Sequence, residues 1–571
     1  MPVDGPKHWR NASATLPPRR GVRRGMVLFI VMVVIVMISL AGLSFVITMS
    51  TENKAVHLHG DELQIEQAVG SGAELLKAFA ALSLQQREEA GGGYDNPELF
   101  RAAIVVEGKP EGHRARFSVV SPRTEDGLTA GIRFGAENES ARLNLASLPQ
   151  WEKQRPGAAR DALMNLSGMT EPIAEAILDW IDDDPTPRPN GAEADYYSGL
   201  GVPYGPRNGI PTSLEELLLI RDVSRELLFG ADADFNFQTG EAERQFASPG
   251  AGIGMAASGL PWASLLTVYS AERNASFEGT PRIHLNEKDL AKLHEAISEA
   301  FDSDWADFIV AYRQFGPHEE DGGVDRQEGP GRPRSPRTER GPRRDWQPQS
   351  ARTGRGGAEA VKLDLSLPAK FEIESVLDLV GVQVQLADPD APPSDDDPPP
   401  VLDSPLSPDQ PTARDDLFTL VDRTAVVGDK VIRGRINVNE APREVLLGVP
   451  GMDPSTVDQI LTARGPRTAG DDSSRRHALW LYTEGIVDLD EMRALLPYLT
   501  TGGDVFRAQL VGFFDDSGPS ARAELVVDAT GSPPKQVYWK DLRLLGRGYS
   551  LETLGAESTL EDASISERAE N

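Results

Sequence analysis

The chain has 571 residues, 39% of them hydrophobic, and a formal net charge of −30. This length exceeds one ordinary core and predicts two or more domains with linkers, and the acidic charge disfavours binding to nucleic acid or anionic lipid. The sequence holds no cysteine, which excludes disulfides, thiolate metal sites, iron–sulfur clusters and cysteine nucleophiles.

Residues 1–25 are basic and are followed abruptly by an apolar run. Their charged side chains are Lys7, Arg10, Arg19, Arg20, Arg23 and Arg24 against Asp4. Met26–Thr48 has no charged residue, and as a helix it is long enough to cross a hydrocarbon core of ~30 Å. The positive-inside rule places residues 1–25 in the cytoplasm. We therefore predict a retained single-pass anchor at 26–50, in preference to a buried soluble helix or a cleavable secretory signal.

The junction between the basic leader and the apolar run has a specific form. Arg23-Arg24-Gly25 leads directly into Met26 without a polar spacer, which resembles a type IV prepilin leader, cut after glycine. Gly25 and Met26 are therefore the candidate cleavage site. Cleavage there would make Ile30 the fifth residue, where ordinary pilins carry glutamate. A plain uncut anchor remains the alternative.

The exported part is predicted to be α+β. Residues 52–83 have apolar positions spaced by three and four, which predicts that the helix continues past the membrane and packs on a sheet. Five β-like runs lie near the two ends of the chain: Ala102–Glu107, Arg114–Val120, Val505–Phe514, Ala521–Asp528 and Gln536–Leu545. Because a lone hairpin is barely stable, we expect one sheet built from both ends, with the middle of the chain inserted into it.

The middle of the chain is helical and contains a short repeated motif. Ala141-Arg142-Leu143-Asn144-Leu145 is echoed at 281–286 and at 434–439, and helix patterns follow each copy. The third copy reads as helix, glycine turn, helix through Pro450-Gly451-Met452, whereas the middle copy, over 287–315, has no such turn. This predicts duplicated small helical domains.

The predicted domain boundaries follow from these patterns and from composition. Two stretches, 316–360 and 387–414, are rich in Pro, Gly and charge and are predicted to be disordered. The full order is leader 1–25, transmembrane helix 26–50, stalk helix and first strands 51–135, first helical insert 136–315, linker 316–360, short ordered segment 361–386, acidic linker 387–414, second helical insert 415–500, closing strands 501–549 and acidic tail 550–571.

One acidic cluster is a candidate metal site. Four carboxylates lie in Asp179-Trp180-Ile181-Asp182-Asp183-Asp184, and two more follow in Gly191-Ala192-Glu193-Ala194-Asp195. Crowded carboxylates repel one another unless a cation neutralises them, and hard oxygen ligands on a loop suit Ca²⁺. The spacing is not that of an EF-hand. A solvated acidic loop remains the alternative, and a carboxylate-pair hydrolase is disfavoured.

Other chemistry is weakly indicated. The hairpin Leu446–Ile460 is typical of helix-hairpin-helix modules, which bind DNA phosphates, but the acidic charge favours a structural role. Signatures of serine hydrolases, zinc proteases and phosphate-binding loops are absent, and no histidine lies beside a serine and an aspartate in a recognisable pattern. We therefore predict that the protein is not an enzyme.

Together these residues resemble the minor pseudopilin K family of type II secretion systems, also called general secretion pathway protein K. The resemblance is carried by the leader and its helix, by Arg142–Leu145, Asp179–Asp184, Gly191–Glu193 and Ser213–Leu217, and by Ile436-Asn437-Val438-Asn439-Glu440-Ala441-Pro442 with the closing strands. It implies a pilin-like α/β fold interrupted by SAM-like helical inserts. The segment 281–315 and the two linkers depart from the family pattern.

The resemblance also implies a function. It places the protein in the inner membrane, with its N-terminus cytoplasmic and its bulk periplasmic, at the tip of a pseudopilus that supports export across the outer membrane. Its implied partners are other minor pseudopilins, the inner-membrane secretion platform and prepilin peptidase, without nucleic acid. It implies Ca²⁺, which we carry onto Asp179, Asp182, Asp184, Glu193 and Asp195. The alternatives are a competence-type DNA receptor, which would share the motif at 436–441, and an anchored hydrolase.

Overall fold

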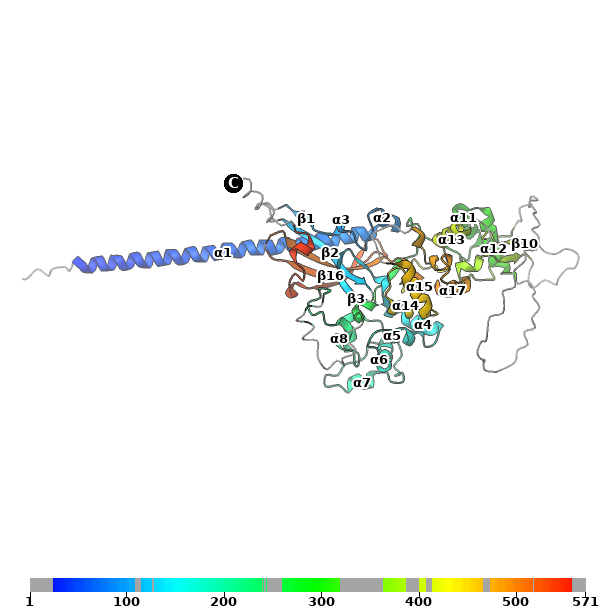
Figure 1. The fold of residues 1–571 in the computed structure, drawn as a ribbon, viewed down its shortest axis with the longest axis horizontal. Helices are drawn as coiled ribbons and strands as arrows, with labels where there is room; N and C mark the ends of the chain where they lie inside the picture. Colours follow the sequence, from blue (N-terminus) through cyan, green and yellow to red (C-terminus); the bar gives the residue numbers. More distant parts are fainter. Residues whose placement is uncertain are drawn as a thin grey trace, which may run out of the picture. The chain divides into compact units, whose positions relative to one another are not determined.

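The computed structural model describes residues 24–107, 114–125, 128–238, 240, 243, 259–318, 363–386, 400–406, 413–465, 473–516 and 518–556. These residues are α+β, as expected (Figure 1). They divide into two compact units, Met1–Gln64 and Ile65–Asn571. The leader residues 1–23 lie outside the described residues.

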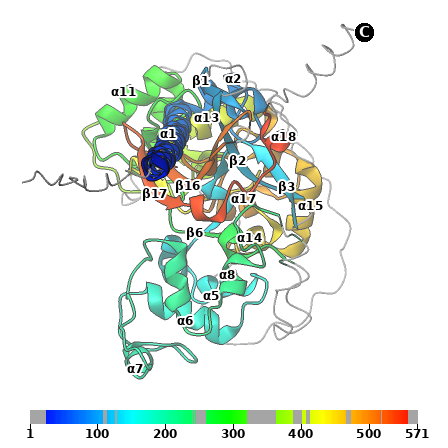
Figure 2. The same ribbon diagram turned by 90° about the vertical axis from the view of Figure 1, so that its left-hand side faces the viewer.

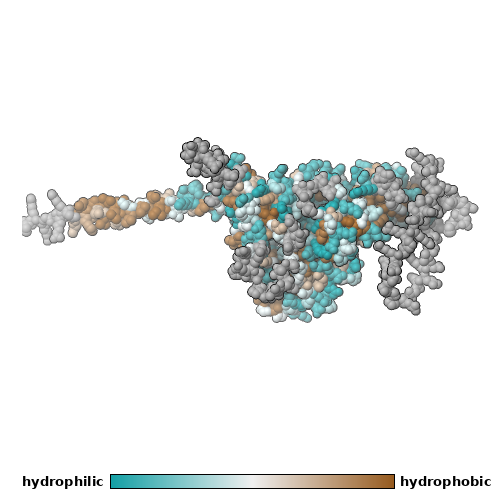
Figure 3. All heavy atoms as spheres, viewed as in Figure 1, coloured by the Kyte–Doolittle hydropathy of each residue, from teal (hydrophilic) through white to brown (hydrophobic). Residues whose placement is uncertain are grey.

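Helix α1 spans Arg24–Ala81 without interruption. The absence of proline lets one helix run through the apolar segment and the amphipathic segment, which confirms the predicted continuation. Within the first unit the side chains from Met26 to Met49 are exposed and mostly apolar, and Figure 3 shows them as a brown run. It is the one helix in the described part of the chain that is long and apolar enough to cross a membrane. His57 and His59 are exposed on it.

The sheet of the second unit is built from both ends of the chain, as predicted. Its order is β1-β2-β15-β16-β17, with β3 paired to β2 and β4 paired to β15. The strands are β1 Ala103–Val106, β2 Ala115–Glu125, β3 Leu128–Phe134, β4 Glu137–Asn138, β15 Val505–Phe514, β16 Ala521–Asp528 and β17 Lys535–Asp541. The pairing of β15 with β2 joins residues almost 400 positions apart, Gln509 opposite Val120. Strand β3 was missed by the sequence, and β17 ends before the predicted Leu545, because Arg543–Leu545 forms the 3₁₀ turn η6.

One face of α1 packs on this sheet. Ile65, Val69, Leu76 and Phe79 recur at helical spacing and are buried against alternate residues of β2, β15 and β16. A side chain at Gly512 would place its Cβ 2.9 Å from the Ile65 carbonyl oxygen, so glycine allows the helix and strand to approach closely. Each fully buried side chain of this kind contributes about 1.5–3 kcal/mol.

Between β4 and β15 lies the insertion, which carries most of the helices. Its first part holds η1 Glu139–Ala141, β5 Leu143–Asn144, η2 Leu145–Ser147, α4 Leu148–Gln154, α5 Ala158–Met164, α6 Glu171–Ile181, α7 Ala194–Ser198, η3 Leu214–Leu219, α8 Arg225–Phe229, α10 Trp262–Leu265 and β6 Leu266–Thr267. The next part holds β7 Ala271–Arg273, β8 Ile283–His284, α11 Leu290–Ala300, α12 Ser303–Phe315, η4 Val376–Leu379, β9 Gln383–Gln385, β10 Val401–Asp403, α13 Ala413–Arg423 and β11 Thr424–Ala425. The last part holds β12 Val431–Arg433, β13 Ile436–Asn437, α14 Arg443–Leu447, α15 Pro454–Arg464, η5 Ser473–Arg475, α16 Trp480–Thr483, α17 Leu489–Leu495 and β14 Leu499–Thr500.

The repeated motif has a structural counterpart in all three copies. Each motif forms a two-residue strand that pairs in parallel with a strand after its own helices: β5 with β6, β8 with β11, and β13 with β14. Glycine turns separate α5 from α6 at Gly168 and α14 from α15 at Gly451, both with positive φ. In the middle copy α11 and α12 are joined without such a turn, as predicted. The insertion thus consists of three parallel-closed helical units.

This arrangement corrects the predicted domain boundaries. The second insert was expected to begin at residue 415, but α13 belongs to the middle unit because β11, which follows it, closes on β8. The units also share one hydrophobic core, to which Leu163, Ile309 and Leu446 contribute. Helices α5, α6, α7 and α8 gather in one lobe of the second unit (Figure 2). The insertion therefore holds three helical units with a shared core, where the sequence predicted two separate inserts.

Two predictions of disorder are wrong in part. Within the stretch 387–414, Val401–Asp403 forms β10 antiparallel to β9, and Leu406 is buried. The tail expected from 550 begins with helix α18, Leu551–Leu554, because Leu554 is buried against the sheet. The stretches 319–362, 387–399, 407–412 and 557–571 lie outside the described residues. Helices α2, Leu84–Glu89, and α3, Pro97–Phe100, complete the fold.

Candidate calcium site and buried polar network

The predicted acidic cluster lies at the end of α6 and on the loop that follows it. The apolar face of α6 buries its C-terminal turn, so Asp179 is fully buried, and Asp182 caps the helix. Asp179 accepts a hydrogen bond from the backbone N–H of Arg188 at 3.1 Å. At Gly191 a Cβ would lie 2.0 Å from Asp179 Oδ2. Glycine is therefore required for the loop to return over the carboxylate and bring Glu193 back to it.

The carboxylates perturb one another. Burial and then the charge of Asp184 raise the pKa of Asp182 to about 6. Burial and then the charges of Asp179 and Asp182 raise the pKa of Glu193. Glu193 is 4% exposed, and neither of its carboxylate oxygens has a hydrogen-bond partner among the described residues. The nearest cation is Arg188, whose Nε lies 3.5 Å from Asp182 Oδ2. A buried carboxylate without donors is costly unless a cation binds there.

The structure brings only part of the predicted set together. Asp179 and Glu193 are buried, Asp182 near them is partly exposed, and the charge of Asp184 acts on them from the exposed loop. Asp195 lies exposed in the first turn of α7.

A second carboxylate group was missed by the sequence. Asp232, Asp234 and Glu243 have carboxylate oxygens within 4.8 Å of one another, a tighter group than any other in the described part of the chain, the predicted site included. Its sequence signal is the Asp-x-Asp spacing. However, Asp232 accepts the backbone N–H groups of Asn236 and Phe237, and Glu243 accepts those of Ala233 and Gly240. These carboxylates are satisfied by local turns.

The helix-hairpin-helix of α14 and α15 is closed to phosphate. Asp453 caps α15 by accepting the backbone N–H groups of Ser455 and Thr456, and the hydrogen bonds from these two residues lower its pKa to about 2. Arg443 is paired with Asp458. The N-terminus of α15, which is the positive end of the helix dipole, thus already holds the Asp453 carboxylate. This favours a structural role over DNA binding.

One histidine has contacts that the sequence pattern did not show. His294 of α11 has Nε2 3.0 Å from Asp307 Oδ1 and Nδ1 3.4 Å from Ser298 Oγ. Ser298 lies one helical turn after His294, and Asp307 comes from α12, so only the packing of the two helices unites them. Neither of the two cavities found in the described residues includes them. The contact joins the helical hairpin.

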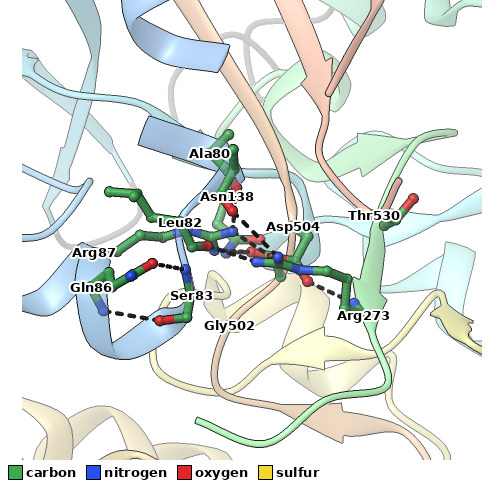
Figure 4. A network of polar contacts seen from close by, with 12 residues as sticks. Ala80, Leu82, Ser83, Gln86, Arg87, Asn138, Arg273, Gly502, Asp504 and Thr530 are labelled. Atoms are coloured by element: carbon green, nitrogen blue, oxygen red, sulfur yellow. Dashed lines mark hydrogen bonds and ion pairs between the residues drawn. The ribbon is translucent and has the colours of Figure 1, made fainter. Parts of the chain in front are cut away.

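A buried polar network joins the ends of the chain to the insertion (Figure 4). Asp504, just before β15, accepts hydrogen bonds from Arg87 Nη2 at 2.5 Å, from Arg273 Nη2 at 2.8 Å and from Arg273 N at 2.6 Å. Arg87 also donates to the carbonyls of Ala80 and Gly503. Burial alone would raise the pKa of Asp504, but the two arginines lower it below its usual value. Helix α2, strand β7 and the exit of the insertion thus meet at one carboxylate.

The entry of the insertion is held in the same way. Glu139 is fully buried and lies 2.6 Å from Arg507 Nε of β15 and 3.6 Å from Arg142 Nη1. A Cβ at Gly503 would lie 2.4 Å from Ser140 Oγ, so the entering and leaving chains pass in close contact. Buried ion pairs therefore hold the chain both where it leaves the sheet for the insertion and where it returns to the sheet.

Comparison with known proteins places one part of this chain. Residues 141–229 match the family model of type II secretion system protein K. Over these residues the chain is similar to the type II secretion system protein K family. The protein K region contains β5, the first helical unit up to α8, and all five predicted calcium ligands. Asp232, Asp234, Glu243 and the other two units lie beyond it.

A relative and a solved structure are similar to this chain to different extents. Type II secretion system protein K of Pectobacterium carotovorum subsp. carotovorum is 34% identical over 99 residues, which are 17% of this chain and 28% of the relative. The chain therefore matches little more than a quarter of that relative's length. The solved GspK-GspI-GspJ complex of enterotoxigenic Escherichia coli aligns over 85% of this chain and 99% of the solved chain, at 9% identity and a TM-score of 0.35. Similarity at this level does not establish a shared fold.

Proposed function

We propose that this protein is a minor pseudopilin at the tip of a type II secretion pseudopilus, which supports protein export across the outer membrane by assembly and not by catalysis. The match of residues 141–229 to the protein K family carries the proposal. It is supported by α1, whose apolar residues 26–49 are exposed and whose residues 65–81 pack on a sheet closed by both chain ends, an arrangement like that of pilins. The three helical units are then SAM-like inserts into that sheet.

The proposed topology and partners follow from the same elements. Residues 1–25 would be cytoplasmic, α1 would anchor the protein once in the inner membrane, and the rest would be periplasmic. The partners would be other minor pseudopilins, the secretion platform and prepilin peptidase. Ile30 in place of glutamate fits a subunit with none above it. The capped N-terminus of α15 gives the DNA-receptor alternative no support.

Processing of the leader tests the proposal directly. When the full chain is expressed with prepilin peptidase and purified from membranes, we expect N-terminal sequencing and intact mass to give a mature chain beginning at Met26. Gly25→Leu is expected to leave the leader uncut, because the peptidase cuts after a small residue. Gly42→Leu, a change at an exposed glycine of α1 with no atom within 4 Å of the added Cβ, is expected to be cut normally. A wild-type chain that still begins at Met1 contradicts the proposal.

We further propose that Ca²⁺ binds among Asp179, Asp182 and Glu193, with Asp184 completing the set. The buried and unpartnered Glu193 carboxylate and the glycine that makes room at Gly191 support this. The cation would neutralise these carboxylates, whose pKa values are raised by burial and then by mutual repulsion, and would fasten the loop to α6.

Calcium is therefore expected to stabilise the protein. At a free concentration about 100 times the dissociation constant, it should add ~2.7 kcal/mol to the free energy of unfolding relative to excess chelator, measured by urea unfolding of the full chain in detergent. Glu193→Gln should abolish the increment, whereas the exposed Asp195→Asn should keep it. Equal increments in wild type and Glu193→Gln would rule the site out.

A further inference from the structure

A cavity with a volume of about 900 Å³ lies within the second unit. It is lined by the β7–β12 ribbon, by β11 with the end of α13, by Trp151 of α4 and by residues 496–504. Arg273 and Asp504 of the network in Figure 4 form part of its wall. Most of these residues lie outside the region that matches protein K. The proposed assembly function therefore leaves the cavity unexplained.

Arg282 lines this cavity and has a guanidinium with unused hydrogen-bond donors. Its backbone N–H donates to the Asn274 carbonyl at 3.1 Å, and its Nε donates to the Asp422 carbonyl at 2.9 Å. Neither terminal nitrogen of its guanidinium has a hydrogen-bond partner among the described residues. Burial lowers the pKa of Arg282. The guanidinium is only partly buried, so its two terminal nitrogens reach the water of the cavity and remain able to donate to an anion.

The neighbouring carboxylates of Glu272 and Asp422 act on Arg282 through their charge but accept no hydrogen bond from its terminal nitrogens. Glu272 is held by Arg435 Nη1 at 3.2 Å and by the Thr500 hydroxyl at 2.6 Å. Asp422 Oδ1 accepts the backbone N–H of Phe277 at 2.8 Å and lies 3.9 Å from His477 Nε2. Both carboxylates therefore already accept hydrogen bonds from other donors.

The rim adds charges of both signs. Lys430 and Arg433 are exposed and form no ion pair in the described part of the chain, and Glu374 and Asp429 are exposed carboxylates. Exposed charges of this kind are screened by solvent. Selectivity for an anion is therefore expected from the partly buried guanidinium more than from the rim.

The shape of the cavity indicates the class of ligand. A guanidinium presents two parallel donors that match a carboxylate. A volume of about 900 Å³ is far larger than a single carboxylate needs and is at the upper end of ligand sites. β12 lines the cavity and pairs only with β7 in the described part of the chain, so the other edge of this partly exposed strand is available to an added strand.

We propose that this cavity binds an extended acidic peptide segment of another protein, and that the Arg282 guanidinium takes one of its carboxylates. Main-chain hydrogen bonds to an open strand edge would hold the peptide, and Arg282 would select for the acidic side chain. The proposal does not depend on the secretion function, since binding is measured on the isolated protein.

The test uses the full chain in detergent and a fluorescein-labelled octapeptide of alternating serine and glutamate, followed by fluorescence anisotropy. We expect this peptide to bind and the matching serine–glutamine peptide not to bind. Arg282→Gln should weaken binding by about tenfold or more, as for loss of a charge-assisted pair. Arg433→Gln, which removes a cation from the exposed rim, should weaken it by less than about threefold.

Several outcomes would overturn the proposal. They are no binding to the wild type, equal weakening by Arg282→Gln and Arg433→Gln, or displacement of the peptide by an equal concentration of inorganic phosphate, which would indicate a site for small anions. If Arg282→Gln does not fold, Arg282→Lys decides the matter. Lysine keeps the charge but lacks the planar fork, so we expect a loss of several-fold, and an unchanged affinity would also overturn the proposal.

Discussion

Asp504→Asn is expected to lower the free energy of unfolding by about 3–5 kcal/mol, the range for breaking a buried ion pair. The carboxylate is almost completely buried and is shared by Arg87 and Arg273. Removing its charge would leave two guanidinium groups close together, one of them buried. The effect should be large because the same contact joins α2, β7 and the start of β15.

Urea unfolding of the full chain in detergent measures this loss. Asp490→Asn is the matched control, because Asp490 also pairs with an arginine, Arg493 at 2.8 Å, but its side chain is 87% exposed. We expect the control to change the free energy by less than about 1 kcal/mol. If both variants lose the same small amount, the network does not hold the insertion to the sheet.

Phe79→Ala is the second substitution expected to have a large effect, a loss of about 3–5 kcal/mol. Phe79 is 3% exposed and packs edge-to-face on Phe100 at 5.4 Å and on Phe506 at 6.3 Å between ring centroids. It therefore links α1 to α3 and β15, and no neighbouring side chain can fill the space without leaving its own contacts.

The matched control lies on the same helix. Leu63 is 48% exposed, so Leu63→Ala should cost no more than about 0.5 kcal/mol. The same urea titration measures both variants. A cost below about 1 kcal/mol for Phe79→Ala would mean that α1 is not docked on the sheet as described.

The sequence predicted the bounds of an element well where a short run of residues shows by its own pattern which side chains are buried. The bounds of β15 and β16 match the predicted runs, because these strands carry β-forming side chains over eight or more residues and end at turn residues. Helix α6 also has local signals at both ends, a proline in its first turn and Asp182 at its C-cap. Strand β10 was missed because its three residues lie among prolines and aspartates and are ordered only by pairing with β9.

The candidate calcium site was predicted in part. The acidic loop was evident from composition, and Asp179, Asp182 and Glu193 do come together. Sequence spacing could not show that Asp195 is exposed, because that depends on where α7 begins. Nor could it show that Glu193 is left without donors, which is a property of the packed loop.

The sequence by itself determined the anchor, the acidic loop and the two strand-forming ends, because each depends on local composition or period. Only the tertiary structure decided how the repeats close, how Asp504 meets Arg87 and Arg273, and which guanidinium faces a cavity. These contacts join positions up to 417 residues apart. A window of sequence carries no information on such pairings, since they are selected by packing and charge compensation once the chain is compact.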